Sequence, residues 1–241
     1  MDSKVRKLKE SVEENPDDAK AWYDLGYRLV ELGKFEDAAE SYQKATELDP
    51  TNIDAWYDLS GVLGELGRWE ESAHASEQTL ELDPEFADGW YNLGAVYYNM
   101  ARYEEAIVAS RYAAKFDPEN ASAWKHVGLA FAGLGRIEEA IESFRKVLDL
   151  EPERATTWMN MGAMLAGIGR LEEAAEALER SVEADKLNPT AWKNLGMVYL
   201  HLGREKKAAK ALENYSMLDH LQKRLERGGP FTARLREQEN R

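Results

Sequence analysis

Residues 21–50 read AWYDLGYRLVELGKFEDAAESYQKATELDP, and the chain repeats this stretch with variations. The tryptophan near its start recurs every 34 residues, at Trp22, Trp56, Trp90, Trp124, Trp158 and Trp192. An apolar residue and usually a glycine follow at constant offsets, as in Leu25-Gly26, and an acid-proline pair such as Asp49-Pro50 closes most units. A fixed period of this length indicates one structural unit copied along the chain.

Each unit is typical of two helices joined by a turn. Trp124, Val127 and Phe131 stand at i, i+3 and i+7, with Gly128 on the same stripe, which is the spacing of one helix face. A glycine inside a helix costs about 1 kcal/mol, so its recurrence suggests that the partner helix packs against bare backbone there. A second glycine, Gly135 in this unit, ends the first helix in the left-handed conformation. An apolar second helix follows.

These residues resemble the tetratricopeptide repeat, whose pattern places tryptophan, leucine, glycine, alanine and proline at these offsets. The resemblance covers about nine tenths of the chain and implies an all-α, right-handed α-solenoid of six tandem 34-residue helix-turn-helix repeats with capping helices. The boundaries that we predict are an N-terminal capping helix at 1–18, a C-terminal solvating helix and basic tail at 221–241, and six repeats at 19–52, 53–86, 87–120, 121–154, 155–188 and 189–220.

Both ends of the array need a separate interpretation. Residues 3–14 have helical periodicity and stop at Asn15-Pro16, in register with the second helix of a repeat. We favour a cap over the first repeat; a segment cut from a longer array is the alternative. After Tyr215 the repeat register fades, and residues 218–225 are typical of a further helix that Gly228-Gly229-Pro230 ends. In the family, such a helix covers the last open face.

Composition excludes several classes of protein. The 241 residues carry a net charge of −14, which argues against a nucleic-acid ligand because nucleic acids bind basic surfaces. The apolar runs are too short to cross a bilayer, and the N-terminus lacks a signal-peptide core, so we expect a cytoplasmic protein without membrane insertion. With no cysteine, the chain has neither disulfides nor thiolate metal ligands.

No catalytic constellation accompanies the repeats. The sequence has no Gly-rich phosphate loop, no His-Glu-x-x-His motif and no nucleophile elbow. Its four histidines are scattered, and the Glu-Glu pairs stand at helix starts, where the helix dipole accounts for them. We therefore predict a protein that is not an enzyme and that needs no cofactor or metal.

The candidate binding surface is the face of each first helix opposite its tryptophan stripe. In the family that this chain resembles, these positions line the concave groove and contact bound peptides. With the tryptophan counted as position 4 of its repeat, these positions include 2, 6 and 13. In the first three repeats they have six acids and one lysine, whereas in the last three repeats they have no acid. The predicted groove residues are Tyr23, Asp24, Tyr27, Asp54, Tyr57, Asp58, Asp88, Tyr91, Asn92, Lys125, His126, Asn160, Lys193 and Asn194.

We interpret this as a groove of two characters. Its acidic, tyrosine-lined half suits a Lys/Arg-bearing protein or peptide segment, because carboxylates pair with the charge while aromatic faces hold the cation. Its second half, with Asn160 and Asn194 one repeat apart, suits the backbone of an extended peptide. The alternative is that acids on exposed helices only increase solubility.

Some members of the family hold the C-terminal acid of a chaperone in a carboxylate clamp of lysines and asparagines. Lys125 and Asn160 match two positions of that clamp. Leu129 stands where its other asparagine belongs, and Thr190 and Asn194 replace the remaining cations. The departures argue against a chaperone-tail ligand.

The resulting functional prediction is a scaffold or adaptor that binds a partner segment in its groove. A second hypothesis is self-association, in which the basic tail or the last helix of one chain docks in the acidic groove of another. Residues 200–241 hold 10 Lys+Arg against 6 Asp+Glu, a local charge of +4, which leaves −18 for residues 1–199. A third hypothesis is the recognition arm of a larger enzyme complex.

Overall fold

The structure is a computed structural model that describes residues 2–226. Thirteen helices and no strand make up this part of the chain. The helices are α1 (Ser3–Glu14), α2 (Ala19–Glu31), α3 (Phe35–Leu48), α4 (Ile53–Glu65), α5 (Trp69–Leu82), α6 (Ala87–Asn99), α7 (Tyr103–Phe116), α8 (Ala121–Gly133), α9 (Ile137–Leu150), α10 (Ala155–Gly167), α11 (Leu171–Ala184), α12 (Pro189–His201) and α13 (Glu205–Glu226).

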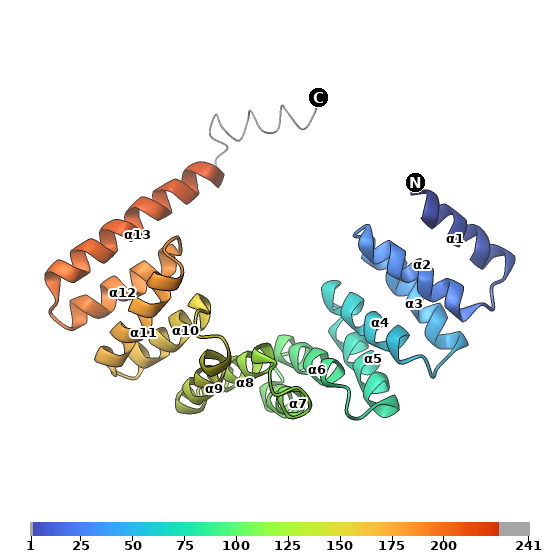
Figure 1. Ribbon diagram of the computed structural model, residues 1–241, viewed down its shortest axis with the longest axis horizontal. Helices are drawn as coiled ribbons and strands as arrows, with labels where there is room; N and C mark the ends of the chain where they lie inside the picture. Colours follow the sequence, from blue (N-terminus) through green and yellow to red (C-terminus); the bar gives the residue numbers. More distant parts are fainter. Residues whose placement is uncertain (1, 227–241) are drawn as a thin grey trace. The chain divides into compact units, whose positions relative to one another are not determined.

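The chain divides into two compact units, residues 1–139 and 140–241, whose boundary falls inside α9. In unit 1 each helix packs on its neighbours in sequence, from α1 through α8. In addition, α2 contacts α4, α4 contacts α6, and α6 contacts α8. In unit 2, α10 packs on α11 and α12 on α13 (Figure 1). Contacts with sequence neighbours are those that a repeat array makes.

Side-chain caps start several of the first helices. The side chains of Asp18, Asn52, Asn120 and Asn188 each accept a hydrogen bond from a backbone N–H in the first turn of the helix that follows. Such caps satisfy donors that the helix itself leaves unpaired. The residue types at the repeat boundaries therefore determine where these helices begin.

The glycine inside the first helix allows the second helix to pack closely, as predicted. A Cβ built on Gly26 would lie 2.7 Å from the Tyr42 ring, and one on Gly162 would lie 2.7 Å from Leu178. Repeat 2 has Ser60 at this position, and its main-chain carbonyl accepts a hydrogen bond of 2.7 Å from Ser72 of the facing helix. Small residues on both sides keep that pair of helices close.

The turn between the two helices of a repeat uses the left-handed backbone conformation. Gly33, Gly67, Gly135, Gly169 and Gly203 have φ between 67° and 78°. In repeat 3 the same turn position is Ala101, with φ of 57°. The chain thus keeps the turn even where a side chain makes that conformation costly.

The repeated tryptophans are partly exposed to solvent. All six are half-buried rather than hidden between neighbours. Five of them donate an indole N–H to a main-chain carbonyl six residues earlier, at 2.7 to 3.0 Å; these are Trp22, Trp56, Trp90, Trp158 and Trp192. An indole N–H requires a hydrogen-bond acceptor, and in these five repeats a loop carbonyl supplies it.

The two end helices differ in how well they were predicted. Helix α1 lies on α2, where Val5 and Val12 are buried and Asp2 forms an ion pair of 2.9 Å with Arg28. At the other end, the separate helix predicted after Tyr215 does not exist, because α13 is one helix that runs through to Glu226. No glycine or proline interrupts it. The predicted stop and basic tail, residues 228–241, lie outside the described residues.

In the part of the chain that the structure describes, no helix has the length and apolar character needed to cross a bilayer.

Candidate functional site

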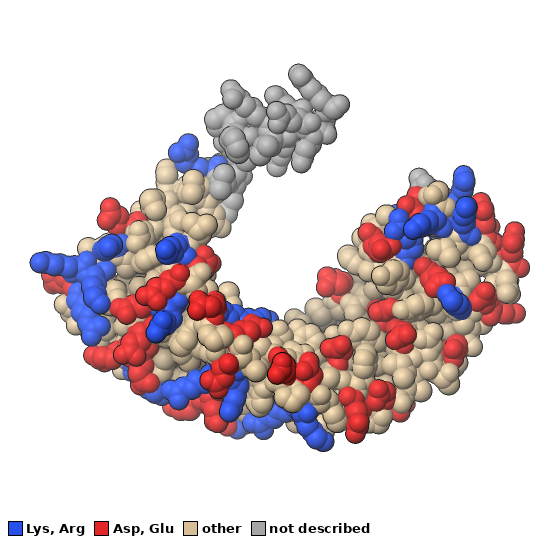
Figure 2. All heavy atoms as spheres, viewed as in Figure 1, with Lys and Arg blue, Asp and Glu red and all other residues tan. Residues whose placement is uncertain are grey.

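The predicted groove residues of unit 1 lie on α2, α4, α6 and α8. These helices follow one another at the repeat period, and α2 touches α4, α4 touches α6, and α6 touches α8. On the face shown in Figure 2, Asp and Glu side chains lie over α4 and α5, whereas unit 2 has Lys and Arg interspersed with its acids.

Asp58 of α4 is the most constrained of the predicted acids. It is half-buried, and its carboxylate accepts a hydrogen bond of 2.9 Å from the Tyr23 hydroxyl of α2. Burial raises the pKa of Asp58, and the negative charge of Asp54 raises it further, while the hydroxyls of Tyr23 and Tyr42 act in the opposite direction. The carboxylate is therefore costly to ionise at this position.

Two tyrosines form the wall beside this carboxylate. The rings of Tyr23 and Tyr42 are 5.6 Å apart between centroids, and Tyr42 is only 1% exposed. Burial, and then hydrogen bonding to Asp58, raises the pKa of Tyr23. Both hydroxyls therefore stay protonated and act as donors toward the carboxylate. Tyr27, one turn along α2 from Tyr23, is 55% exposed and leaves an aromatic face open to solvent.

The remaining acids are in different situations. Asp24 forms an ion pair of 2.6 Å with Lys20 on the same helix. Asp54 and Asp88 are exposed. Within residues 2–226, neither these two nor Asp58 has an ion-pair partner. Three of the four predicted aspartates thus have no cation of their own.

Further along unit 1 the predicted residues meet aromatic partners. Tyr57 packs edge-on against Phe86, with ring centroids 5.2 Å apart, and Asn92 donates to the Ser60 hydroxyl at 3.4 Å. Burial raises the pKa of Tyr57. These contacts bring α4 and α6 together.

A stack of rings lies between α6 and α8. The His126 imidazole is parallel to Tyr91, at 4.9 Å between centroids, and to Tyr98, at 6.4 Å. Its predicted neighbour Lys125 is half-buried on the same helix. Tyr91 and His126 are therefore brought together, but as a packed stack rather than as separate groups on an open surface.

In unit 2 the predicted residues are spread over two helices. Asn160 is half-buried on α10, and Lys193 is exposed on α12, 5.9 Å above the Tyr215 ring. Asn194 lines a hollow of about 450 Å³ together with Met197 and His201. Small residues of α10, among them Ala163 and Gly167, complete that hollow. The hollow has room for a side chain, and Asn194 provides a polar group at its wall.

Sequence reasoning missed three residues that shape the site, namely Tyr42, Ser60 and Phe86. Tyr42 belongs to the second helix of its repeat, outside the predicted groove positions, yet it reaches Asp58 of the next repeat. One signal was available in the sequence. Tyr42 is a large residue at a position, opposite Gly26, where the next two repeats have the small residues Ser76 and Ser110. Ser60 stands where the other repeats have glycine, and nothing in the sequence marked Ser60 or Phe86 as part of the site.

The scan against protein families matches most of the chain. A model described as TPR repeat matches residues 26–67 and 62–100, and one described as tetratricopeptide repeat matches residues 87–120. The middle TPR-like domain of cilia and flagella-associated protein 70 matches residues 115–219. A search of the curated proteins found no match.

Solved structures with the same fold support this result. YrrB, described as a TPR protein with an unusual peptide-binding site, is 25% identical, with a TM-score of 0.65 over 76% of this chain and 95% of YrrB. PilF of Pseudomonas aeruginosa is 22% identical, with a TM-score of 0.69 over 91% and 97% of the two chains. MamA is 23% identical, with a TM-score of 0.66 over 70% and 92%. The predicted all-α repeat fold is confirmed, while the number of repeats stays a prediction.

Proposed function

The chain belongs to the tetratricopeptide repeat family, and we propose that it is a non-catalytic protein-interaction scaffold whose unit 1 binds a Lys- or Arg-bearing segment of a partner protein. In this proposal the first-helix surface of unit 1 recognises the cationic side chain. The asparagines of unit 2, Asn160 and Asn194, serve the backbone of an extended segment. YrrB, whose description includes a peptide-binding site, offers a precedent on the same fold.

The observation that carries the proposal is the half-buried, cation-free carboxylate of Asp58. Among the described residues the donors that reach it are neutral hydroxyls, that of Tyr23 at 2.9 Å and that of Tyr42. A buried charge without a counterion lowers the stability of a fold, and a carboxyl group with a pKa perturbed in this way is a candidate for a functional site. An acid that served solubility alone would be as effective fully exposed.

The surroundings of Asp58 fit a guanidinium or ammonium group. Asp54 on the preceding turn of α4 adds a second negative charge, and Tyr27 presents an exposed ring. A cation bound here gains charge-assisted hydrogen bonds worth about 1.5–3 kcal/mol and a further contact with an aromatic face. Both gains depend on the charge of the ligand rather than on its length.

A double-mutant cycle tests this proposal. The probe is a fluorescein-labelled peptide with one arginine, compared with the same peptide carrying citrulline, which is neutral and of the same shape. Binding is measured by fluorescence anisotropy with the wild type and with Asp58→Asn, which keeps an acceptor for Tyr23. We expect each single change to weaken binding, and a coupling energy of about 1.5 kcal/mol or more between the two changes.

The matched control is Glu40→Gln, which removes one negative charge from an exposed position of α3. This control should leave the affinity for the arginine peptide unchanged. If Asp58→Asn and Glu40→Gln weaken binding equally, net charge rather than this site attracts the peptide. If Asp58→Asn binds the peptide as the wild type does, the assignment is wrong.

A further inference from the structure

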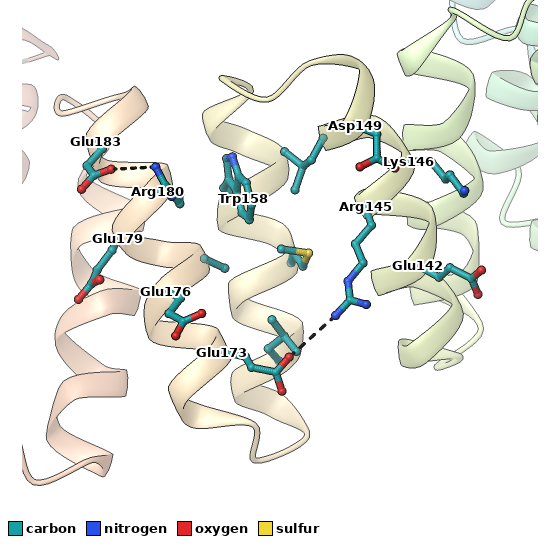
Figure 3. Close-up of a pocket in the computed structure, with 14 residues that line it drawn as sticks. Glu142, Arg145, Lys146, Asp149, Trp158, Glu173, Glu176, Glu179, Arg180 and Glu183 are labelled. Atoms are coloured by element: carbon teal, nitrogen blue, oxygen red, sulfur yellow. Dashed lines mark ion pairs between the residues drawn. The ribbon is translucent and has the colours of Figure 1, made fainter.

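Unit 2 contains a hollow on a different face from the predicted groove. It has a volume of about 990 Å³ and lies among α9, α10 and α11 (Figure 3). Trp158, Met161 and Leu165 of α10 form its apolar floor, and charged residues of α9 and α11 form its sides. We call it the Trp158 furrow. Neither Asn160 nor Asn194 lines it, so it is separate from the groove positions.

The repeat architecture provides the same furrow in unit 1, but smaller. There the floor is Trp56, Leu59 and Leu63, three periods earlier in the sequence, and the volume is about 450 Å³. In this smaller furrow the His74 ring packs edge-on against Trp56 at 6.1 Å. The Trp158 furrow therefore repeats a feature of the fold and has about twice the room.

In repeat 3 an aromatic ring lies on the tryptophan. The Tyr112 ring stacks on Trp90, with centroids 4.6 Å apart and an interplanar angle of 23°. The equivalent position in repeat 5, two periods later, is Arg180, which lines the open furrow beside Trp158. Repeats 3 and 5 thus differ at this position in whether an aromatic ring stacks on the tryptophan.

The charges of the Trp158 furrow are unbalanced. Its lining residues include six acids against three cations, a net charge of −3. Arg145 approaches Glu173 at 3.9 Å, and Arg180 approaches Glu183 at 3.8 Å, both at exposed positions. Asp149 and Glu176 have no ion pair with any described residue. Figure 3 shows Glu176 below Trp158, between Arg145 and Glu179.

We propose that the Trp158 furrow is a second docking site, whose occupant is a cationic protein segment that carries a large apolar side chain. The apolar side chain lies on Trp158, Met161 and Leu165, where it removes apolar area from water. A neighbouring arginine or lysine pairs with Glu176 and Asp149. The volume is at the upper end for ligand pockets, so the furrow holds several residues rather than one side chain.

The probe for this site is a labelled peptide with the sequence of residues 227–241, RGGPFTARLREQENR, added in trans to the full chain. It has the required chemistry, since Phe231 and Leu235 alternate with arginines. Anisotropy titrations compare the wild type with Glu176→Lys and with Glu153→Lys, an exposed acid outside the furrow. We expect Glu176→Lys to weaken binding about tenfold or more, and Glu153→Lys to have much less effect.

A second variant separates the furrow from general attraction between charges. Arg180→Tyr places on Trp158 the ring that Tyr112 places on Trp90, and it also makes the chain more negative. If only net charge attracted the peptide, this variant would bind more tightly than the wild type. The proposal expects weaker binding, because the ring fills the space over the floor.

Circular dichroism of each variant confirms that the helices are intact. Unchanged or tighter binding by Arg180→Tyr overturns the proposal, as does equal weakening by Glu176→Lys and Glu153→Lys. Absence of wild-type binding to the peptide also overturns it. Loss of binding in Asp58→Asn alone would assign the peptide to the unit 1 surface instead, so failure here is distinguishable from failure of the proposed function.

Discussion

Replacing Ala101 by glycine should stabilise the protein. Ala101 lies in the turn after α6 with φ of 57°, and it is the one residue other than glycine with positive φ among those that the structure describes. The five equivalent turns all use glycine. Ala101 is exposed, so its methyl group contributes little packing that the substitution would remove.

The magnitude follows from two opposing effects. An L-residue in the left-handed region costs about 1–2 kcal/mol, which Ala101→Gly recovers. Glycine also gives the unfolded chain more conformational freedom, which reduces that gain by about 0.4–1 kcal/mol. The expected net gain is about 1 kcal/mol, or a rise of roughly 2–4 °C in Tm for a chain of this size.

Urea denaturation followed by circular dichroism at a helical wavelength measures this change. The matched control is Gly135→Ala, whose φ is 72° and whose added Cβ would have nothing within 4 Å. It tests backbone strain alone and should lose about 1 kcal/mol. If Ala101→Gly is neutral or destabilising while Gly135→Ala behaves as expected, strain at residue 101 is not the cost that we infer.

Two further predictions concern the interior of unit 1. Gly26→Ala should lower the free energy of unfolding, because overpacking against Tyr42 costs about 1–3 kcal/mol, more than the ~1 kcal/mol gained in helix propensity. The control is Gly61→Ala, which has open space at its Cβ. It should raise the free energy of unfolding by up to about 1 kcal/mol in the same denaturation assay. Asp58→Asn should be more stable than the wild type at neutral pH, because the raised pKa of Asp58 means that its ionised form destabilises the fold. Since the folded state then holds a proton that the unfolded state releases, this difference should shrink as the pH falls through the folded pKa of Asp58 toward the ordinary aspartate value. A difference that stays constant over that range would exclude the titration of Asp58 as its source.

Local residue chemistry was sufficient to predict the helical hairpins. The 34-residue period, the glycine at five of the six turns and the acid-proline pairs place breaks between helices, and the structure has breaks at these points. The close approach at Gly26 was likewise predictable, because only a missing side chain makes room for a facing helix. These features depend on neighbours in the sequence, and the pattern reports them directly.

Features that depend on partners far apart in the sequence were not predictable. The pattern indicates that Asp58 lies on an exposed face, but not that Tyr23 and Tyr42 of the preceding repeat close over it. The Trp158 furrow also escaped prediction, because its depth results from the lengths of side chains on three helices. Whether Asp58 and the other predicted residues contact a ligand stays a prediction.

The lack of an ion-pair partner for Asp58 among the described residues also affects the rate at which the protein is degraded in a cell. A scaffold with an uncompensated charge is less stable alone than when a cationic partner is bound, because a ligand that binds only the native state adds to its stability. Small differences in stability change the fraction of molecules that proteases remove. If the proposed cationic partner binds at Asp58, the abundance of this protein should therefore follow the supply of that partner, with the unoccupied copies degraded first.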